Sequence, residues 1–261
     1  MSFSGEVAIV TGCGRGIGRA IAERLAGEGA RIIANDILPN ELDDAVRACR
    51  AAGSDAVGVE GDIAEPSTSE RLVATAIESF GRLDIVVNNA FWARTSDFLT
   101  QSAEEWSRIQ DVSLNGAVLL TRAALPLLVA QASGAIVNVA SIHSLAAGRR
   151  YAAYEVAKTG LVGLTRAVAG DFGRDGVRCN AVCPGLVITE RNAGWWSEDR
   201  VGWVSNAYPL GRVGTATEVA AAVAFLASSD ASFITGVCLP VDGGLTAILP
   251  EVPALRLYDA Q

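Results

Sequence analysis

The sequence predicts an α/β fold, with one doubly wound parallel sheet of about seven strands and helices on both of its faces. Short runs of apolar, mostly β-branched residues alternate along the chain with longer segments of helical periodicity. The runs are apolar at nearly every position, as in Ile85-Val86-Val87, which is typical of strands buried on both faces. The 261 residues fit one large α/β domain and no linker interrupts them, so we expect a single domain over residues 1–261.

Each element follows from this alternation. The expected strands are Val7–Thr11, Arg31–Asp36, Ala56–Glu60, Leu83–Asn88, Gly134–Ser141, Val177–Cys183 and Val237–Val241. The expected helices are Ile17–Glu28, Glu41–Ala52, Ser67–Phe80, Ala103–Val129, Tyr151–Asp171 and Thr217–Ala227. Two regions depart from the pattern. Residues 189–213 carry three tryptophans without a strand, which predicts a lid, and the tail at 245–261 could pack on a neighbouring subunit or be loose.

Composition excludes several classes of protein. The 21 Lys and Arg against 29 Asp and Glu give a net charge of −8, which leaves no basic surface for nucleic acid or an anionic membrane. Apolar stretches such as Leu125–Ala130 are shorter than the roughly 18 residues of a membrane span, and the N-terminus lacks signal-peptide features, so we expect a cytoplasmic protein. The five scattered cysteines fit free thiols, and no Cys and His spacing indicates a metal site.

A glycine-rich turn joins the first expected strand to the first expected helix. Gly12, Gly16 and Gly18 follow the spacing G-x-x-x-G-x-G, and Gly14 lies between them. Glycines allow a turn and a helix N-terminus to approach a pyrophosphate, whose charge is met by free N–H groups and the helix dipole. A tight turn without a ligand would explain one or two of these glycines, but four favour a dinucleotide site.

Polar residues at the ends of other strands extend this prediction. Asp36 ends the second expected strand, where a carboxylate can accept both ribose hydroxyls of NAD and repel the 2′-phosphate of NADP. Arg15 weakens the preference for NAD slightly, because it could reach a phosphate. Asp62 and Asn88-Asn89-Ala90 follow the third and fourth strands at the same edge of the sheet, although each could be a turn former.

Tyr154 and Lys158 indicate acid–base chemistry. Their spacing of four places both side chains on one face of the expected helix, and Ser141 follows the preceding strand. An ammonium beside a phenol favours the phenolate and lowers its pKa from about 10, so that it can act as general acid or base. A Tyr-x-x-x-Lys pair on an ordinary exposed helix is common, but the neighbouring motifs argue against that interpretation.

The motifs together resemble the short-chain dehydrogenase/reductase family in its short single-domain form, over nearly the whole chain. The resemblance rests on Thr11-Gly12 with Gly16 and Gly18, Asp62, Asn88-Asn89-Ala90, Asn115, Ser141, Tyr154 with Lys158, Pro184-Gly185 with Thr189, and Asp242-Gly243-Gly244. It implies a Rossmann-like fold and an NAD(P)-dependent oxidoreductase acting on CH–OH groups. It also implies a homotetramer or homodimer, with the helices from Ala103 and Tyr151 and the last strand at interfaces.

The resemblance also assigns roles to residues. Tyr154 would be the acid/base, and Lys158 would lower its pKa and hold the nicotinamide ribose. Ser141 would polarise the substrate oxygen, and Asn115, where the long helix should bend, would position a water that relays the proton. The implied cofactor residues are Gly12, Arg15, Gly16, Ile17, Gly18, Asp36, Asp62 at the adenine, Ile63, Asn89, Ala90, Tyr154, Lys158, Pro184, Gly185, Val187 and Thr189.

One position departs from the family pattern. Phe91 replaces the glycine that usually follows Asn-Asn-Ala, so its ring either turns away or narrows the space beside the nicotinamide ribose. The candidate substrate-pocket residues are Phe91, Trp92, His143, Tyr151 and Trp196. For His143, the only histidine, we prefer a pocket or packing role, because Tyr154 already supplies the proton function.

Three functional hypotheses remain. The first is an NAD-dependent oxidoreductase that interconverts a small secondary alcohol and a ketone by hydride transfer. The second is an NADPH-type ketoreductase acting on a biosynthetic or carrier-bound keto intermediate, which Asp36 opposes. The third is a non-catalytic dinucleotide-sensing protein, which the presence of Ser141, Tyr154 and Lys158 opposes.

Overall fold

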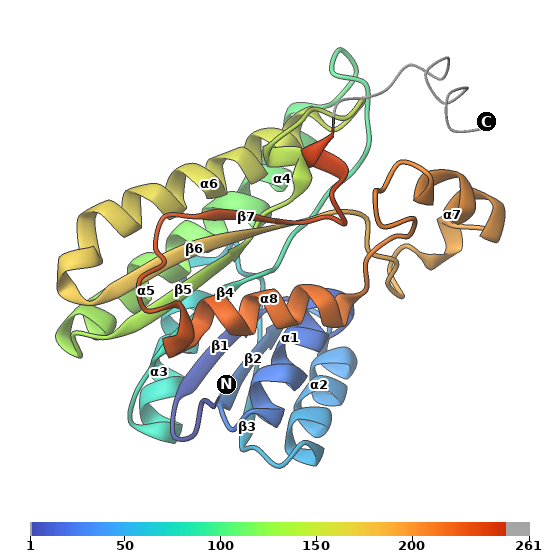
Figure 1. Ribbon diagram of the computed structural model, residues 1–261. Helices are drawn as coiled ribbons and strands as arrows, with labels where there is room; N and C mark the ends of the chain where they lie inside the picture. The colour runs from blue at the N-terminus through green and yellow to red at the C-terminus, as the bar shows by residue number, and fades with distance from the viewer. Residues whose placement is uncertain (1, 249–261) are drawn as a thin grey trace.

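One parallel sheet forms the centre of the molecule, as the sequence predicts. The structure is a computed structural model that describes residues 2–248. Its seven strands have the order β3-β2-β1-β4-β5-β6-β7 (Figure 1). They are β1 (Val7–Thr11), β2 (Arg31–Asp36), β3 (Ala56–Glu60), β4 (Ile85–Asn88), β5 (Gly134–Val139), β6 (Val177–Pro184) and β7 (Cys238–Val241). Each observed strand end lies within two residues of its expected position.

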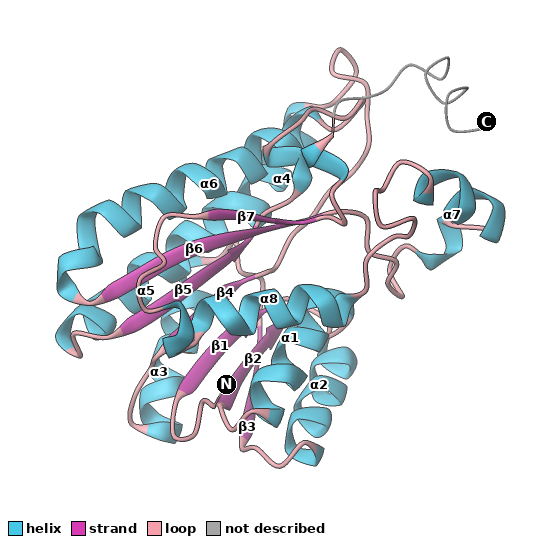
Figure 2. Ribbon diagram, viewed as in Figure 1, coloured by secondary structure: helices cyan, strands magenta, loops and turns pink. Residues whose placement is uncertain are grey.

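Helices cover both faces of this sheet (Figure 2). Helices α1 (Gly16–Gly27), α2 (Pro39–Ala51) and α8 (Ala216–Ala227) pack on one face, and α3 (Pro66–Phe80), α5 (Gly116–Ala130) and α6 (Ala152–Phe172) on the other. Successive side chains of a strand point to opposite faces. In β1, Ala8 and Val10 therefore join the first apolar core, whereas Val7 and Ile9 join the second. This double burial explains the apolar runs in the sequence.

The expected helix Ala103–Val129 is interrupted, as its predicted bend requires. It consists of α4 (Ala103–Gln110), a π-helical segment η1 (Asp111–Asn115) and α5. Gly116 begins α5 at a close contact, because a Cβ there would lie 2.8 Å from Ile63 Cγ2. By length and composition the run Ala103–Ala130 could cross a membrane, in contrast to the expectation that every apolar stretch is too short, but half of its most apolar window is buried in the fold.

The predicted lid contains short helices and, over its fully described length of 189–213, no strand. Helix α7 (Glu198–Ser205) follows a 3-10 turn at Ala193–Trp195, and α7 stands away from the sheet in Figure 1. Trp195 and Trp203 are 70% and 78% exposed, so these two rings do not anchor the lid to the core. Most of the predicted tail, residues 249–261, lies outside the described residues.

Candidate active site

The carboxyl ends of the central strands bring the candidate residues together. The strand order reverses between β1 and β4, and in open α/β sheets ligands bind at this switch point. Asn89 connects the two sides, because its Nδ2 atom donates to the carbonyl oxygens of Thr11 and Gly12, at 2.9 Å each. The backbone N–H groups of Asn89 and Ala90 donate to the Thr11 hydroxyl. Asn89 and Ala90 therefore fix the position of the glycine-rich turn.

Three glycines of this turn are required by close approach. Gly12 has φ +61°, and a Cβ there would lie 2.8 Å from the Ala90 Cα. Gly16 has φ +60°, and a Cβ there would lie 3.1 Å from the Thr189 side chain. A Cβ on Gly18 would overlap the Gly12 carbonyl oxygen and Asn89 Nδ2. Glycines at these positions let the turn pack closely against β4 and the loop after β6, as the tight turn of a pyrophosphate site requires.

The Glu190 carboxylate lies at the N-terminus of α1. The Gly16 N–H, at the first turn of this 12-residue helix, donates to Glu190 Oε2 at 3.2 Å. A carboxylate at this position shows that the N–H group points outward, where a phosphate oxygen would be bound in the same way. The turn and the helix start therefore fit a dinucleotide pyrophosphate. Ile17, the next residue, packs partly buried against the core on the α1 side of the sheet.

Asp36 and Arg15 lie beside the turn. Asp36 Oδ2 accepts the Gly14 N–H at 2.8 Å and Oδ1 accepts the Leu38 N–H at 3.1 Å, so the carboxylate braces the turn. One carboxylate oxygen can accept more than one hydrogen bond, so these contacts leave capacity for ribose hydroxyls. Arg15 forms an exposed ion pair with Glu41 at 3.4 Å, which reduces its availability to a 2′-phosphate.

The remaining cofactor candidates lie on two loops. After β3, Asp62 pairs with Arg108 of α4 at 2.6 Å, and Ile63 is buried beneath Gly116. After β6, a Cβ on Gly185 would lie 3.1 Å from Asp242, so this turn needs a glycine. Three further cofactor candidates lie near Gly185 in the sequence. Pro184 ends β6, Val187 is buried, and the Thr189 side chain faces Gly16.

Ser141, Tyr154 and Lys158 converge where β5 meets α6. Ser141 follows β5 and is buried, and its hydroxyl forms a hydrogen bond with Tyr154. Lys158, one turn along α6, is also buried, with its Nζ atom 5.7 Å from the centre of the Tyr154 ring. Nζ donates to the Val139 carbonyl oxygen at 2.7 Å. The predicted proximity of the three side chains is therefore present.

The protein's own groups shift the phenol in the direction opposite to the prediction. Burial raises the pKa of Tyr154 to about 12, although the Ser141 hydrogen bond and the positive charge of Arg191 lower it in part. Burial also lowers the pKa of Lys158 to about 7. The cost of burying the charged forms of both side chains outweighs the attraction between the phenolate and the ammonium, so the predicted lowering of the Tyr154 pKa is wrong for the protein alone.

The Phe91 ring turns toward Tyr154 and Lys158 and not away from them. Its ring centre lies 6.1 Å from that of Tyr154 and 5.5 Å from Lys158 Nζ. The Arg191 guanidinium covers the ring at 4.3 Å. The ring therefore narrows the space beside Tyr154 and Lys158, and the Arg191 cation over its face stabilises this position.

The other pocket candidates also surround Tyr154, except for Trp196. His143 Nδ1 lies 3.0 Å from Glu155 Oε1, and the His143 ring packs at 4.7 Å from Tyr151 and 5.7 Å from Tyr154. Trp92 packs in the small apolar cluster that includes Tyr154. Trp196 is partly buried in the lid, and a substrate contact for it remains a prediction.

The sequence and structure match known proteins over most of their lengths. A family profile described as enoyl-(acyl carrier protein) reductase, of the short-chain dehydrogenase/reductase type, matches residues 12–246. Meso-2,3-butanediol dehydrogenase of Serratia marcescens is 41% identical over 247 residues, covering 95% of this chain and 97% of that one. The chain belongs to the short-chain dehydrogenase/reductase family.

Further relatives of this short-chain dehydrogenase/reductase act on different substrates. The 3-oxoacyl-[acyl-carrier-protein] reductase FabG of Escherichia coli is 34% identical, covering 94% of this chain and 99% of that one. A crystal structure of an Agrobacterium tumefaciens protein, provisionally described as a gluconate dehydrogenase, has a TM-score of 0.91 at 33% identity, covering 95% and 98% of the two chains. The protein is thus an oxidoreductase that acts on alcohols or ketones with NAD(H) or NADP(H).

The structure corrects one catalytic candidate of this short-chain dehydrogenase/reductase. Asn115 is exposed, and its Nδ2 atom donates to Asp111 at 2.9 Å rather than facing Tyr154. Two residues earlier, Ser113 is buried, and its hydroxyl donates to the Trp92 carbonyl oxygen at 2.8 Å and accepts the Trp92 N–H at 3.0 Å. The π-helical segment changes which side chain points inward, so Ser113 supports the active-site loop and Asn115 does not.

Asn88 and the lid residues complete the site. Asn88 Nδ2 donates to Asn138 Oδ1 at 2.8 Å, and Asn138 donates to Thr165, so Asn88 ties β4 to β5 and α6. Glu190 and Arg191 were not predicted from the sequence, because they follow Thr189 in a loop without periodicity. The signal that could have identified them as site residues is their charge next to the motif residue Thr189. Among residues 2–248, no group of three or more His, Cys, Asp and Glu side chains could hold a metal ion.

Proposed function

We propose that this enzyme is an NAD-dependent oxidoreductase that interconverts a small secondary alcohol and a ketone. The convergence of Ser141, Tyr154 and Lys158 beside the glycine-rich turn is the observation that carries the proposal. Relatives named for butanediol and hydroxycyclohexanecarboxylate oxidation support an alcohol substrate. Since the homologues are dehydrogenases and reductases, the hypothesis of a non-catalytic sensor is not retained.

The chain offers contacts along the length of the dinucleotide. The backbone around Gly12, Gly16 and Gly18 would hold the pyrophosphate and Asp36 the adenosine ribose. Asp62 would meet the adenine, Lys158 the nicotinamide ribose, and Thr189 with the backbone after Gly185 the carboxamide. The bound dinucleotide would supply hydride transfer to and from the substrate carbon, and these residues would hold and orient it.

The protein's residues handle the proton. In the oxidising direction Tyr154, as phenolate, removes the hydroxyl proton of the alcohol while Ser141 donates a hydrogen bond to the substrate oxygen. In the reducing direction the neutral phenol returns the proton. Because the Tyr154 pKa lies near 12, the phenolate fraction increases with pH and oxidation accelerates, whereas the neutral phenol stays the main form and reduction is unaffected until pH approaches 12. Phe91, His143 and Tyr151 surround the phenol and limit the size of the substrate.

The proposal is tested by following NADH absorbance with a panel of linear, cyclic and hydroxy-acid secondary alcohols. We expect turnover of at least one alcohol with NAD, and faster turnover with NAD than with NADP. If only carrier-bound or thioester ketones react, and only with NADPH, the ketoreductase alternative replaces this proposal. The FabG relatives are the observation that supports the alternative.

Replacing Asp36 with Ala should reduce the preference for NAD. The substitution removes the acceptor for the ribose hydroxyls and the charge that repels a 2′-phosphate, so kcat/KM should fall by about tenfold or more with NAD and rise with NADP. The Asp36→Asn variant is the control, because it keeps one acceptor oxygen without the charge, and it should fall between the two. An unchanged ratio of kcat/KM values in Asp36→Ala would contradict the assignment.

We also propose that the enzyme is a cytoplasmic homotetramer or homodimer. The family resemblance places the helical run α4–α5, helix α6 and strand β7 at interfaces, and β7 is an edge strand with a neighbour on one side only within the described sheet. Edge strands are readily covered by another chain. Light scattering after size exclusion should give two or four times the 27.1 kDa mass of one chain. A monomer at micromolar concentration would refute this part of the proposal.

A further inference from the structure

Two thiols lie in contact beside the reaction site and have no part in the function proposed above. Cys183 is next to the end of β6, and Cys238 begins β7, the edge strand. The two strands pair in parallel, with Ala181 opposite Cys238. Cys183 lies opposite Pro240, so the two cysteines are diagonal neighbours whose side chains point toward each other, with their Sγ atoms 2.9 Å apart. A disulfide bond measures about 2.05 Å, so bond formation needs an approach of the sulfurs by about 0.9 Å and a shift of the short edge strand β7 toward β6.

We propose that Cys183 and Cys238 form a reversible disulfide by exchange with low-molecular-weight disulfides of the glutathione type. The Cys238 thiolate attacks one sulfur of the reagent, forms a mixed disulfide and releases one thiolate. The Cys183 thiol then attacks the Cys238 sulfur, and the second reagent thiol leaves with the Cys183 proton. Two protein thiols are oxidised and one reagent disulfide is reduced to two thiols.

The two cysteines differ in the way this sequence of steps requires. In a single chain Cys238 is partly exposed at the sheet edge, whereas Cys183 is fully buried, and in the proposed oligomer the reagent reaches Cys238 when the β7 edge separates from a neighbouring subunit. The hydrogen bond from the Cys183 thiol lowers the pKa of Cys238 to about 7, and the Arg166 charge on α6 adds to this effect. The same contact and burial raise the pKa of Cys183. Cys238 is therefore the attacking thiolate, and Cys183 is the resolving thiol.

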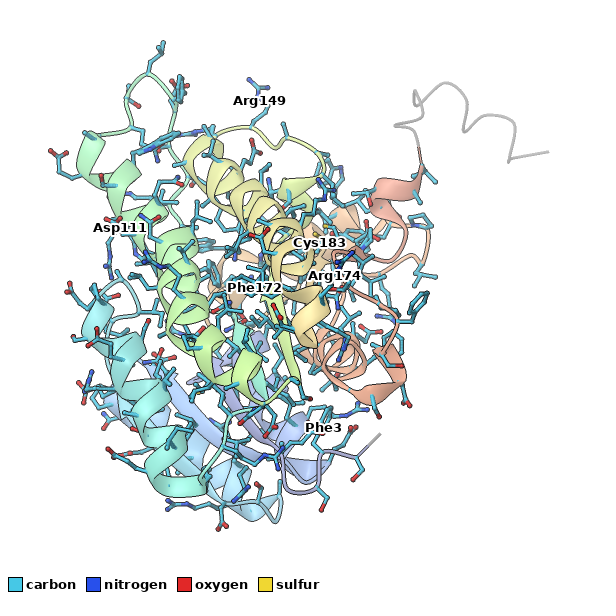
Figure 3. All side chains as sticks on the ribbon, turned by 90° about the vertical axis from the view of Figure 1, so that its left-hand side faces the viewer. Phe3, Asp111, Arg149, Phe172, Arg174 and Cys183 are labelled. Atoms are coloured by element: carbon cyan, nitrogen blue, oxygen red, sulfur yellow. The ribbon has the colours of Figure 1, made fainter. Side chains whose placement is uncertain are left out.

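The position of the pair connects it to the active site. Cys183 immediately precedes Pro184-Gly185, and it packs in the apolar cluster formed by β5, β6 and α6, where Figure 3 labels it. A disulfide would tie the edge strand β7 to the start of the loop that carries Thr189.

The other three cysteines provide internal controls. Cys13, Cys49 and Cys179 are fully buried, and burial raises their pKa values, to about 11 for Cys49 and about 12 for Cys179. Cys179 lies on β6 like Cys183, but its sulfur accepts a long hydrogen bond from Asn138 at 3.6 Å. Cys179 thus matches Cys183 in strand and burial and lacks the neighbouring thiol.

The experiment treats the native, full-length enzyme with oxidised glutathione, then unfolds it and alkylates the remaining thiols for intact-mass and peptide analysis. We expect two of the five thiols to be lost, a peptide that links Cys183 to Cys238, and full recovery with dithiothreitol. Cys183→Ser should stop at a glutathione adduct on Cys238, and Cys238→Ser should not react. Cys179→Ser should behave like the wild type.

Five alkylated thiols after treatment of the native protein would overturn the proposal, as would a disulfide through Cys13, Cys49 or Cys179. Oxidation that requires prior unfolding would overturn it as well. If the serine variants fail to fold, the peptide map of the wild-type protein alone decides. The readout is a mass and not a rate, so its outcome is independent of the substrate and cofactor proposed above.

Discussion

Replacing Tyr154 with Phe should lower kcat for alcohol oxidation by about 10²- to 10⁴-fold, the range expected for the loss of a general acid or base. The variant retains the ring and therefore its packing on Phe91 and His143. It loses only the hydroxyl that forms the hydrogen bond with Ser141. Dinucleotide affinity should be little changed, because Lys158 and the glycine-rich turn are intact. Steady-state kinetics and calorimetric titration with NAD measure the two quantities separately.

Tyr151 provides the matched control for this substitution. It lies next to His143, with ring centres 4.7 Å apart, and its ring centre is 6.2 Å from that of Tyr154. The Tyr151→Phe variant should retain kcat within a few-fold, since its hydroxyl is not expected to carry the substrate proton. Equal losses in both variants would indicate a packing effect instead of proton transfer. Retained activity in Tyr154→Phe would refute the mechanism.

The Gly18→Ala variant should lose both stability and dinucleotide binding. A Cβ at Gly18 overlaps the Gly12 carbonyl oxygen and Asn89 Nδ2, neither of which is the free end of a flexible side chain. The turn must therefore move away from β4, and overpacking of this kind costs about 1–3 kcal/mol of unfolding free energy. Because the displaced atoms form the pyrophosphate site, we expect the Kd for NAD to rise by at least about tenfold. Urea unfolding and calorimetry measure the two effects.

Gly27, at the end of the same helix, provides the control for the Gly18→Ala variant. A Cβ at Gly27 meets nothing within 4 Å, so Gly27→Ala should leave NAD affinity unchanged and stability unchanged or slightly higher. Wild-type affinity in Gly18→Ala would show that the turn does not contact the dinucleotide. A loss of affinity in Gly27→Ala would show that the measured effect is not local to the turn.

The strands were predictable because double burial leaves a direct record in the sequence. Each central strand is apolar on both faces, and its alternation with helices along the chain predicts a parallel sheet with a helix after each strand. The ends of β4 and β5 were less predictable. A strand ends where its neighbour stops supplying hydrogen-bond partners, and residue type does not mark that position. Leu83 and Ser141 could continue a strand by residue type, but they lie just outside β4 and β5.

The active site was predictable where one residue type is physically required. Only glycine tolerates the approach at Gly18, and only a fixed spacing places Tyr154 and Lys158 on one face. The inward position of Ser113 instead of Asn115 depends on a π-helical segment that periodicity does not reveal. The raised Tyr154 pKa depends on burial of the phenol, which is a property of the assembled fold.

The central pairing of β1 with β4 also has a consequence for how the chain reaches this state. The N–H of Val7 donates to Asp84, 77 residues later, so the middle of the sheet forms only after a long loop has closed. Contacts between distant parts of a chain slow folding, because chain entropy is lost before any stabilising interaction forms. The residues around Tyr154 come from the loop after β4 (Phe91), the turn after β5 (His143) and the loop after β6 (Arg191). Catalytic competence should therefore emerge among the last events of refolding, together with completion of the sheet.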